Sequence, residues 1–289
     1  MDLHQPILQW YADHRRDLPW RHDDCSPWGV LVSEVMLQQT PVARVLPVWL
    51  EWMERWPTPG DLALAPAGDA VRAWGRLGYP RRALRLHQCA TAIVEHHDGQ
   101  VPTTEATLLT LPGVGAYTAA AVACFAHGER TVVVDTNVRR VQARTVSGVA
   151  LPAPSLSRAE TDLAAELVPA DPATARVWNV AVMELGALVC TARSPRCTDC
   201  PVADLCVWRR AGRPPYDGPP RRSQGWEGTD RQVRGAMMAV LRAADGAVTL
   251  ADLAPACPDD ELRRMRCLDG LVSDGLVEPV ALGRYRLPA

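Results

Sequence analysis

The chain has 289 residues, of which 47% are hydrophobic, and a formal net charge of −2. This length supports two or three small domains, and the apolar content excludes a chain that is disordered throughout. The near-neutral charge gives no global sign of a nucleic-acid partner, although a local basic stripe on a neutral body is compatible with one.

No apolar run approaches the length of a membrane span. The first ten residues carry acidic and polar side chains where a signal peptide is basic and then apolar. We therefore expect a cytoplasmic protein with no membrane partner. The chain has nine cysteines, an odd number. In a cytoplasmic protein a disulfide framework is not expected, and cysteines that cluster are better explained as metal ligands.

All 31 residues in the lysine-plus-arginine count are arginine. Arginine keeps its proton at any working pH and cannot serve as an amine nucleophile. The composition therefore excludes every mechanism that requires a lysine Schiff base. The N-terminal amine of Met1 is the one amine that remains.

Residues 1–210 are predicted to be all-α, because residues typical of helix ends recur throughout them. Helix starts are indicated at Ser26-Pro27, Thr40-Pro41, Asp171-Pro172 and, by a capping box, Ser157 to Glu160. Helix ends are indicated by Gly78, Gly128 and Gly148. The valine run 132–134 is the one strand-like segment, and it is short enough to be a buried connection.

Residues 211–229 are rich in proline, glycine and arginine, and are predicted to be a linker. The pattern then changes. Helices are predicted at 230–244, 250–256 and 259–273, and a small hairpin at 276–279 and 284–287. Three helices followed by a hairpin resemble a winged helix, a small α+β domain.

A glycine-containing turn lies between two predicted helical stretches, 105–110 and 116–126. Gly113 and Gly115 let the backbone turn tightly and approach a ligand closely. The amides that follow open a helix, which makes them an anion site suited to a phosphate. An ordinary glycine turn between two helices is the alternative.

Glu34 lies on a largely apolar helical stripe with Val30, Leu31 and Leu37. Partial desolvation there raises the pKa of a carboxyl group, so that Glu34 can hold a proton near neutral pH and act as a general acid. From the residues alone, a glutamate at the core edge paired with an arginine is the simpler interpretation.

Asp135 follows the valine run and stands at the predicted start of a helix, where the dipole and free amides favour its ionised form. A simple N-cap is the alternative. With Glu34 it supplies the pair that cleavage of a glycosidic bond requires. One protonated carboxyl serves the leaving group, and one carboxylate faces the cationic sugar.

Four cysteines form a C-x6-C-x2-C-x5-C pattern within 17 residues: Cys190, Cys197, Cys200 and Cys206. Zinc ribbons usually use two C-x2-C pairs set well apart, whereas this compact loop has one. The spacing therefore favours a [4Fe-4S] cluster, with zinc as the alternative. The other five cysteines are scattered and are most simply small apolar residues.

Six segments along residues 1–210 resemble, in order, the MutY family of adenine DNA glycosylases within the helix-hairpin-helix, endonuclease III-like iron–sulfur superfamily. They are LPWR at 18–21, SEVMLQQT at 33–40, LGY at 77–79, LPGVGAYT at 111–118, VDTNVRRV at 134–141 and MELGA at 183–187. The resemblance implies that Glu34 is the catalytic acid, that Asp135 faces the developing cation, and that the four cysteines hold a [4Fe-4S] cluster.

Tyr117 stands where, by this resemblance, endonuclease III carries the lysine of its lyase reaction. Tyrosine cannot form the Schiff base, and no lysine exists elsewhere to replace it. We therefore expect a monofunctional enzyme that hydrolyses the N-glycosidic bond and leaves an abasic site.

The resemblance also implies that the substrate is double-stranded DNA with adenine opposite 8-oxoguanine or guanine. Gln39 and Tyr79 would enter the base stack, because flipping a base leaves a gap for wedge residues. The other expected DNA contacts are Gly113, Gly115, Arg21 and Arg139, with Arg140, Arg193 and Arg196 as further phosphate candidates. A polar helix-end residue, a half-buried core tyrosine and solvated arginines are the alternatives.

The expected architecture is an all-α, two-lobed helix-hairpin-helix glycosylase fold with a small C-terminal winged-helix-like domain. The parts are a cluster lobe (1–21 plus 136–210), a six-helix barrel lobe (22–135), the linker (211–229) and the C-terminal domain (230–289). We expect a monomer, associated with the nucleoid in a bacterium.

Members of the family usually end in a larger domain related to the nucleotide hydrolase MutT. About sixty residues follow the linker, too few for that domain. The C-terminal domain is expected to bind DNA through Arg263, Arg264 and Arg266, or to dock a protein.

Two rival functions follow from the same residues. One is a related glycosylase acting on oxidised pyrimidines or on thymine in G·T mismatches. The other is a non-catalytic iron–sulfur protein that binds DNA, in which replacement of Glu34 or Asp135 would leave function intact.

Overall fold

The computed structural model describes residues 2–219, 225, 227–280 and 283–289. The chain divides into two compact units, 1–30 with 103–110 and 114–221, and 31–102 with 111–113 and 222–289. The boundaries of these units differ from those of the predicted lobes. The lobe boundaries stay a prediction. No helix in the described part of the chain is long and apolar enough to cross a membrane.

The first unit is helical. It contains α1 (His4–His14), the start of α2 (Pro27–Leu37), α7 (Glu105–Leu108), α8 (Ala116–His127), α9 (Thr136–Gln142), α10 (Arg158–Leu167), α11 (Pro172–Leu188) and α12 (Val207–Arg210). A one-turn π-helix at Ala143–Ser147 continues α9. Short 3-10 turns lie at Pro19–Arg21 and Cys197–Asp199.

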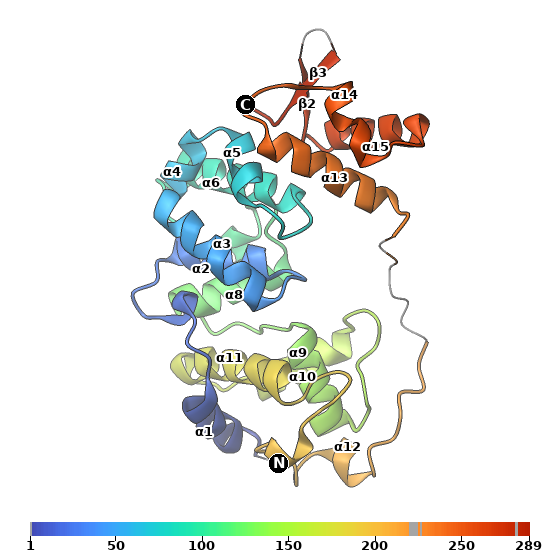
Figure 1. The fold of residues 1–289 in the computed structure, drawn as a ribbon. Helices are drawn as coiled ribbons and strands as arrows, with labels where there is room; N and C mark the ends of the chain where they lie inside the picture. Colours follow the sequence, from blue (N-terminus) through green and yellow to red (C-terminus); the bar gives the residue numbers. More distant parts are fainter. Residues whose placement is uncertain (1, 220–224, 226, 281–282) are drawn as a thin grey trace. The chain divides into compact units, whose positions relative to one another are not determined.

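The core of this unit forms where α11 packs against α1 and α9 (Figure 1). The buried side chains include Ile7, Val138, Trp178 and Leu185, none of which is more than 3% exposed. Because each helix contributes one apolar face, burial of these faces is the main force that holds the three together.

Several predicted helix ends are confirmed. Ser157 and Glu160 form the predicted capping box at α10, and Asp171 accepts a hydrogen bond from Thr174 N at 2.8 Å at the start of α11. Gly128 and Gly148 adopt the left-handed conformation directly after α8 and the π-helix.

Two predicted helix ends are wrong. Helix α3 (Val42–Arg55) begins one residue late, with Pro41 as its cap. The Thr40 hydroxyl accepts from Arg82 Nη2 at 3.1 Å rather than from a backbone amide of the helix, and it donates towards the carbonyls of Gln38 and Leu77. Gly78 has a φ of +86° in a turn rather than at a helix end, since α5 (Ala67–Ala73) has already ended.

The second unit begins with the rest of α2 and contains α3, α4 (Pro59–Leu64), α5 and α6 (Arg81–His96). Its core is built on tryptophans. The ring of Trp52 meets those of Trp56 and Trp74 edge-on, at centroid distances of 4.9 and 5.6 Å. All three indoles are buried.

The C-terminal part contains α13 (Asp230–Ala243), β1 (Val248–Thr249), α14 (Leu250–Leu253), a 3-10 turn (Ala254–Ala256), α15 (Glu261–Ser273), β2 (Glu278–Val280) and β3 (Arg284–Arg286). The three strands form an antiparallel sheet in the order β1-β3-β2, with Tyr285 opposite both Val248 and Pro279. The three predicted helices and the hairpin are confirmed. Strand β1 was not predicted, because a two-residue strand has too little alternation to recognise.

The described residues of the predicted linker form turns and irregular backbone. Residues 220–224 and 226 of that linker, and residues 281–282 between β2 and β3, lie outside the described residues.

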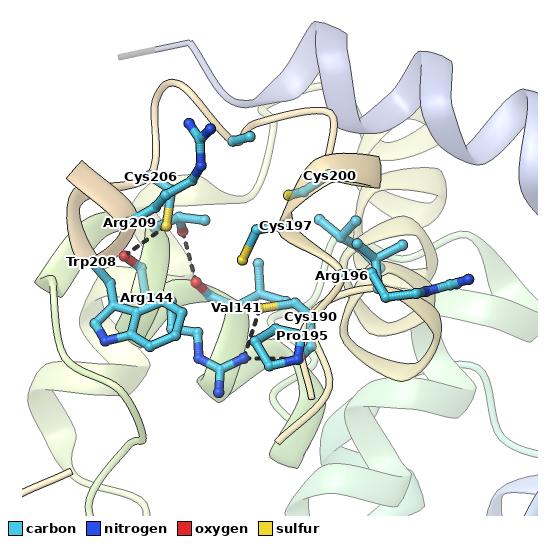
Figure 2. A pocket seen from close by; sticks show the side chains of 14 residues that line it. Val141, Arg144, Cys190, Pro195, Arg196, Cys197, Cys200, Cys206, Trp208 and Arg209 are labelled. Carbon is cyan, nitrogen blue, oxygen red and sulfur yellow. Dashed lines mark hydrogen bonds between the residues drawn. The ribbon is translucent and has the colours of Figure 1, made fainter. Parts of the chain in front are cut away.

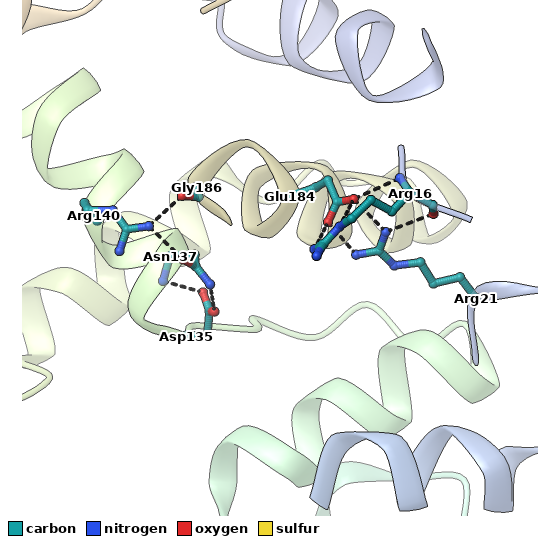
Figure 3. A network of polar contacts seen from close by, with 7 residues as sticks. All are labelled: Arg16, Arg21, Asp135, Asn137, Arg140, Glu184 and Gly186. Atoms are coloured by element: carbon teal, nitrogen blue, oxygen red, sulfur yellow. Dashed lines mark hydrogen bonds and ion pairs between the residues drawn. The ribbon is translucent and has the colours of Figure 1, made fainter. Parts of the chain in front are cut away.

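A buried ion-pair network fixes the N-terminal segment on α11 (Figure 3). Glu184 is fully buried, and its carboxylate accepts from Arg16 Nη2 at 2.6 Å and from Arg21 Nη2 at 2.8 Å. Burial by itself raises the pKa of Glu184, but the hydrogen bonds from the two arginines outweigh it and lower that pKa to about 2.

Replacing Glu184 with glutamine is expected to lower the free energy of unfolding at pH 7 by roughly 3 kcal/mol, because two partly buried guanidinium groups lose their buried anion. In the wild type, the contribution of Glu184 is present above its ordinary pKa of 4.5 and is lost as the pH falls towards about 2. Denaturant unfolding across that range measures both effects.

The exposed Glu166→Gln on α10 is the matched control, with an expected change within about 0.5 kcal/mol. Equal destabilisation in the two variants would show that the network contributes no more than a surface glutamate.

Candidate active site and cluster loop

Four cysteine side chains line one pocket of the first unit (Figure 2). They are the four of the sequence pattern, Cys190, Cys197, Cys200 and Cys206. All four are free thiols, so all are available as ligands. Much of the remaining wall is apolar and includes Val141, Leu185 and Trp208.

Arg144 holds the chain around this pocket. Its guanidinium donates to the carbonyls of Thr191 at 2.7 Å and Ala192 at 3.1 Å, and Nη1 lies 3.3 Å from Cys190 Sγ. The same group lies over the ring of Trp208 at 4.6 Å. Arg144 thus places a donor beside the sulfur of one predicted ligand and holds the backbone that follows it.

The chemistry of this pocket fits an iron–sulfur cluster. Burial raises the pKa of Cys200 to about 11, and the neighbouring cysteines add to the shift, so bound metal charge is needed to keep the thiolates. No three metal-binding side chains in the described part of the chain come together in a way that could hold one ion. A [4Fe-4S] cluster takes four thiolates, and the four cysteines of this pocket would supply them.

Glu34 lies in α2 and is 6% exposed. Its neighbours one turn earlier, Val30 and Leu31, are also buried, so the predicted apolar stripe is present. Burial of a carboxyl group disfavours its charged form. The role of Glu34 as a general acid stays a prediction, and its burial agrees with it.

Asp135 is the N-cap of α9, and its carboxylate accepts three hydrogen bonds, of which Figure 3 shows those from Asn137. The donors are Asn137 N at 2.8 Å, Val138 N at 2.7 Å and Asn137 Nδ2 at 2.7 Å. Burial raises the pKa of Asp135, while these donors and the charge of Arg140 act in the opposite direction. The N-cap effect expected from the sequence is thus present, but burial outweighs it. Every one of these donors is an N–H group, which suits an anion.

A line of hydrogen bonds runs from Asp135 through Asn137 and Arg140 to Gly186 (Figure 3), and Arg140 extends it to the cluster loop. Asn137 donates to Asp135 and accepts from Arg140 Nη2 at 2.7 Å. Arg140 also donates to the carbonyls of Gly186 and Cys190, both at 2.6 Å. A Cβ on Gly186 would collide with Asn137, so α9 and α11 approach this closely only because Gly186 has no side chain. The orientation of Asp135 therefore depends on the backbone of a cluster cysteine.

The predicted hairpin lies between α7 and α8. Gly113 has a φ of +78°, and a Cβ there would press against Arg85, so both the conformation and the space require glycine. Gly115 is the N-cap of α8 and has open space beside it. Tyr117, in the first turn of α8, is half-buried against a small cluster that includes Ala120 and Val133.

Gln39 and Tyr79 share an unusual backbone conformation. Their φ values are +54° and +48°, and among the described non-glycine residues only Asp98 and Arg213 also have positive φ. Both side chains are exposed, Tyr79 by 46%. Residues in this region persist only where their surroundings hold them, and they are enriched at functional sites.

Arg82, in the first turn of α6, supplies that hold and was not predicted from the sequence. Its guanidinium donates to the carbonyl of Gln38 at 2.6 Å, to the carbonyl of Gly78 at 3.1 Å and to Thr40 Oγ1 at 3.1 Å. It therefore clamps the turn that contains Gln39 and the turn that precedes Tyr79. Burial lowers the pKa of Arg82 to about 10, still far above neutral. In the sequence, an arginine three residues after a tyrosine does not indicate this role.

The structure uses several of the predicted DNA-binding arginines internally. Arg21 pairs with Glu184, and the guanidinium of Arg139 is 9% exposed and paired with Glu160 at 2.9 Å. Arg140 donates to Asn137 and to the carbonyls of Gly186 and Cys190. In the C-terminal domain, the three arginines noted from the sequence make internal hydrogen bonds, namely Arg263, Arg264 and Arg266. These contacts favour structural roles. Arg193 and Arg196 lie exposed on the cluster loop, although Arg196 also donates to the carbonyl of Leu188 at 2.7 Å and pairs with Asp199.

Two family models match the chain. Residues 32–166 match the HhH-GPD superfamily base excision DNA repair protein model, and residues 190–206, bounded by the first and last cluster cysteines, match the iron–sulfur binding domain of endonuclease III. The fold and the cysteine loop thus define a helix-hairpin-helix base excision DNA repair protein with an iron–sulfur cluster.

The chain is 56% identical to an adenine DNA glycosylase of Mycobacterium tuberculosis over 98% of this chain and 92% of that protein. This chain belongs to the adenine DNA glycosylase family. It is 54% identical to the adenine DNA glycosylase of Mycolicibacterium smegmatis, over 97% and 94% of the two chains. The human adenine DNA glycosylase is 46% identical over 71% of this chain and 39% of its own length.

Solved structures agree on the fold. A thermostable thymine-DNA glycosylase superposes with a TM-score of 0.64 at 30% identity, covering 71% of this chain and 94% of that one. A non-covalent endonuclease III–DNA complex gives a TM-score of 0.59 at 23% identity, over 74% and 100% of the two chains.

The Cys197→Ser variant is expected to lose most of its iron, because it removes one of the four cluster ligands. Wild-type protein purified without oxygen should contain close to four iron atoms and four inorganic sulfides per chain, measured by metal and sulfide analysis with the visible absorption spectrum. Cys25→Ser is the control, since Cys25 is as exposed as Cys197 and lies outside the loop. One zinc per chain and no visible absorption would identify a zinc site instead.

Proposed function

We propose that the protein removes adenine mispaired with 8-oxoguanine or guanine from double-stranded DNA, by hydrolysing the N-glycosidic bond without cutting the strand. The observation that carries this proposal is the 56% identity with an adenine DNA glycosylase along 98% of the chain. It is supported by the burial of Glu34 and by the N–H donors around Asp135. The proposal treats the protein as a monomer.

Glu34 is the proposed general acid. Its buried carboxyl group gives a proton to a ring nitrogen of adenine, so that the electron pair of the broken C–N bond leaves with a neutral base. Burial supports this role because it favours the protonated form of Glu34 before the reaction.

Asp135 is the proposed stabiliser of the sugar. The deoxyribose becomes cationic as the base departs, and an anion held in place lowers the energy of that state. Water then adds to the sugar carbon and gives its proton to a carboxylate, which completes the hydrolysis. Asn137 and Arg140 keep the Asp135 carboxylate in position before the substrate arrives.

The remaining proposed contacts bind the DNA. Gln39 and Tyr79, exposed on clamped turns, enter the base stack when adenine is flipped. The open backbone at Gly115 admits a phosphate to the first amides of α8. The cluster, when bound to its four cysteines, cross-links the loop that carries Arg193 and Arg196.

A base-release assay tests the proposal. Duplexes carry adenine opposite 8-oxoguanine, adenine opposite guanine, thymine opposite guanine, or thymine glycol, and each reaction is split into alkali-treated and untreated halves. Adenine loss that is visible only after alkali is expected. No release from any duplex by cluster-loaded protein would favour the non-catalytic alternative.

Glu34→Gln and Asp135→Asn are each expected to slow single-turnover adenine release by about 100-fold or more, because each removes a charge or proton that acts in the transition state. Binding of the mispaired duplex should change far less. The exposed Glu51→Gln on α3 is the control and should leave the rate unchanged. Activity retained by both active-site variants would remove these two residues from the mechanism.

Tyr117→Lys is expected to add strand cleavage to a chain that otherwise lacks lysine. An amine at this position would attack the sugar and form a Schiff base. Trapping with borohydride would then yield a covalent protein–DNA complex in the variant and none in the wild type. A wild-type complex that persists when the amine of Met1 is blocked would refute the monofunctional mechanism.

The second candidate function is removal of thymine from G·T mismatches, favoured by the 30% identity with the thymine-DNA glycosylase structure. Release of thymine alone in the same assay would establish it.

A further inference from the structure

The C-terminal domain docks on α5 within the second unit. Gly68 N donates to the carbonyl of Pro288 at 2.8 Å, and a Cβ on Gly68 would collide with that carbonyl. Arg72 donates to the carbonyls of Arg242 and Ala244, and Arg242 Nε donates to the carbonyl of Val71 at 3.1 Å. These are hydrogen bonds in both directions between the two segments, so the contact is specific.

A second set of contacts joins the domain to α6. Asp274, at the end of α15, pairs with Arg81 of α6 at 3.2 Å and with Arg234 of α13. The carboxylate thus bridges a helix of each segment. Its side chain is 20% exposed, so the pair is only partly screened by solvent.

Contacts within the C-terminal domain fix where α13 begins. Thr229 caps the helix, and Asp230 pairs with Arg263 and Arg266 of α15. The next residue is Arg231. Because the cap at Thr229 and the ion pairs of Asp230 hold the first turn of the helix, the direction of the Arg231 side chain is restricted.

Arg231 reaches the tyrosine of the clamped turn. Its guanidinium carbon lies 4.9 Å from the centroid of the Tyr79 ring, and that of Arg82 lies 5.5 Å from the same ring. Both distances are within the range of a cation–π contact. The Tyr79 ring is 46% exposed, and these two cations lie against it.

We propose that Arg231 is a positioning residue for Tyr79, through which the C-terminal domain orients the ring that enters the base stack. This inference rests on the proposed function. The match to the mycobacterial relative covers 98% of the chain and so includes this domain. Arg231 acts on the DNA through Tyr79, and it orders the ring before binding, so the ring loses less freedom when it stacks.

A double-mutant cycle tests the inference. Equilibrium binding to a duplex with adenine opposite 8-oxoguanine, and to a matched duplex, is measured for the wild type, Arg231→Ala, Tyr79→Leu and the double variant. Binding uses the catalytically slowed Glu34→Gln background so that the substrate stays intact. An exposed cation–π contact predicts mispair binding about two- to fivefold weaker in Arg231→Ala, and no further change when Tyr79→Leu is already present.

Two control variants separate this role from simpler ones. Arg284→Ala removes an exposed cation from β3 of the same domain and should leave mispair binding unchanged. Arg231→Lys should recover part of the loss, since an ammonium also binds an aromatic face. The thermal midpoints of all variants should agree with the wild type.

Three results would overturn the inference. The first is a loss of mispair binding on Arg231→Ala that is equally large in the Tyr79→Leu background, together with a salt dependence of binding that falls by about one phosphate contact. That result would make Arg231 a direct phosphate ligand. The second is no effect in either background. The third is an unchanged affinity in Tyr79→Leu itself. Absence of adenine release by the wild type would instead refute the proposed function, whatever the binding results.

Discussion

Buried guanidinium groups hold the irregular backbone that carries the candidate functional residues. Carbonyl groups at helix ends and turns have no helical partner, and they are rarely buried without a donor. Arg82, Arg140 and Arg144 supply these donors to the turns beside α2 and α6, to the end of α11 and to the cluster loop, respectively. A guanidinium can reach several carbonyls at once in a fixed plane, which an ammonium cannot do.

These arginines also connect segments that have different proposed roles. Through Arg140, the backbone of a cluster cysteine and the carboxylate of Asp135 belong to one hydrogen-bonded line. Through Arg82, two strained turns share one clamp. The cluster loop and α6 thus each contact backbone or side chains next to residues proposed to meet the substrate. The absence of lysine has a separate chemical consequence, because it leaves no side-chain amine for a lyase reaction.

Much of the fold could be predicted because its signals are local. The capping box at Ser157 and the cap at Asp171 are read from three or four adjacent residues, and the structure confirms them. The helix start at Thr40 failed for the opposite reason: its hydroxyl is used by Leu77, 37 residues away, and no local pattern indicates that. Strand β1 exists because β3 pairs with it, and its two residues give no pattern of their own.

The sequence by itself determined the four cysteines, the glycine hairpin, the apolar stripe around Glu34 and the lack of any lysine, since each is a matter of composition or close spacing. The tertiary structure alone decided which arginines serve the protein and which remain exposed. Arg139 and Arg193 look equally available in the sequence, but in the structure Arg139 is buried and paired with the half-buried carboxylate of Glu160, whereas Arg193 is exposed. The contact of Arg231 with Tyr79 joins residues 152 positions apart (231 − 79), and it exists because the C-terminal domain docks on α5 and α6. Spacing along a chain fixes neighbours within a few residues, whereas partners at this distance are chosen by packing.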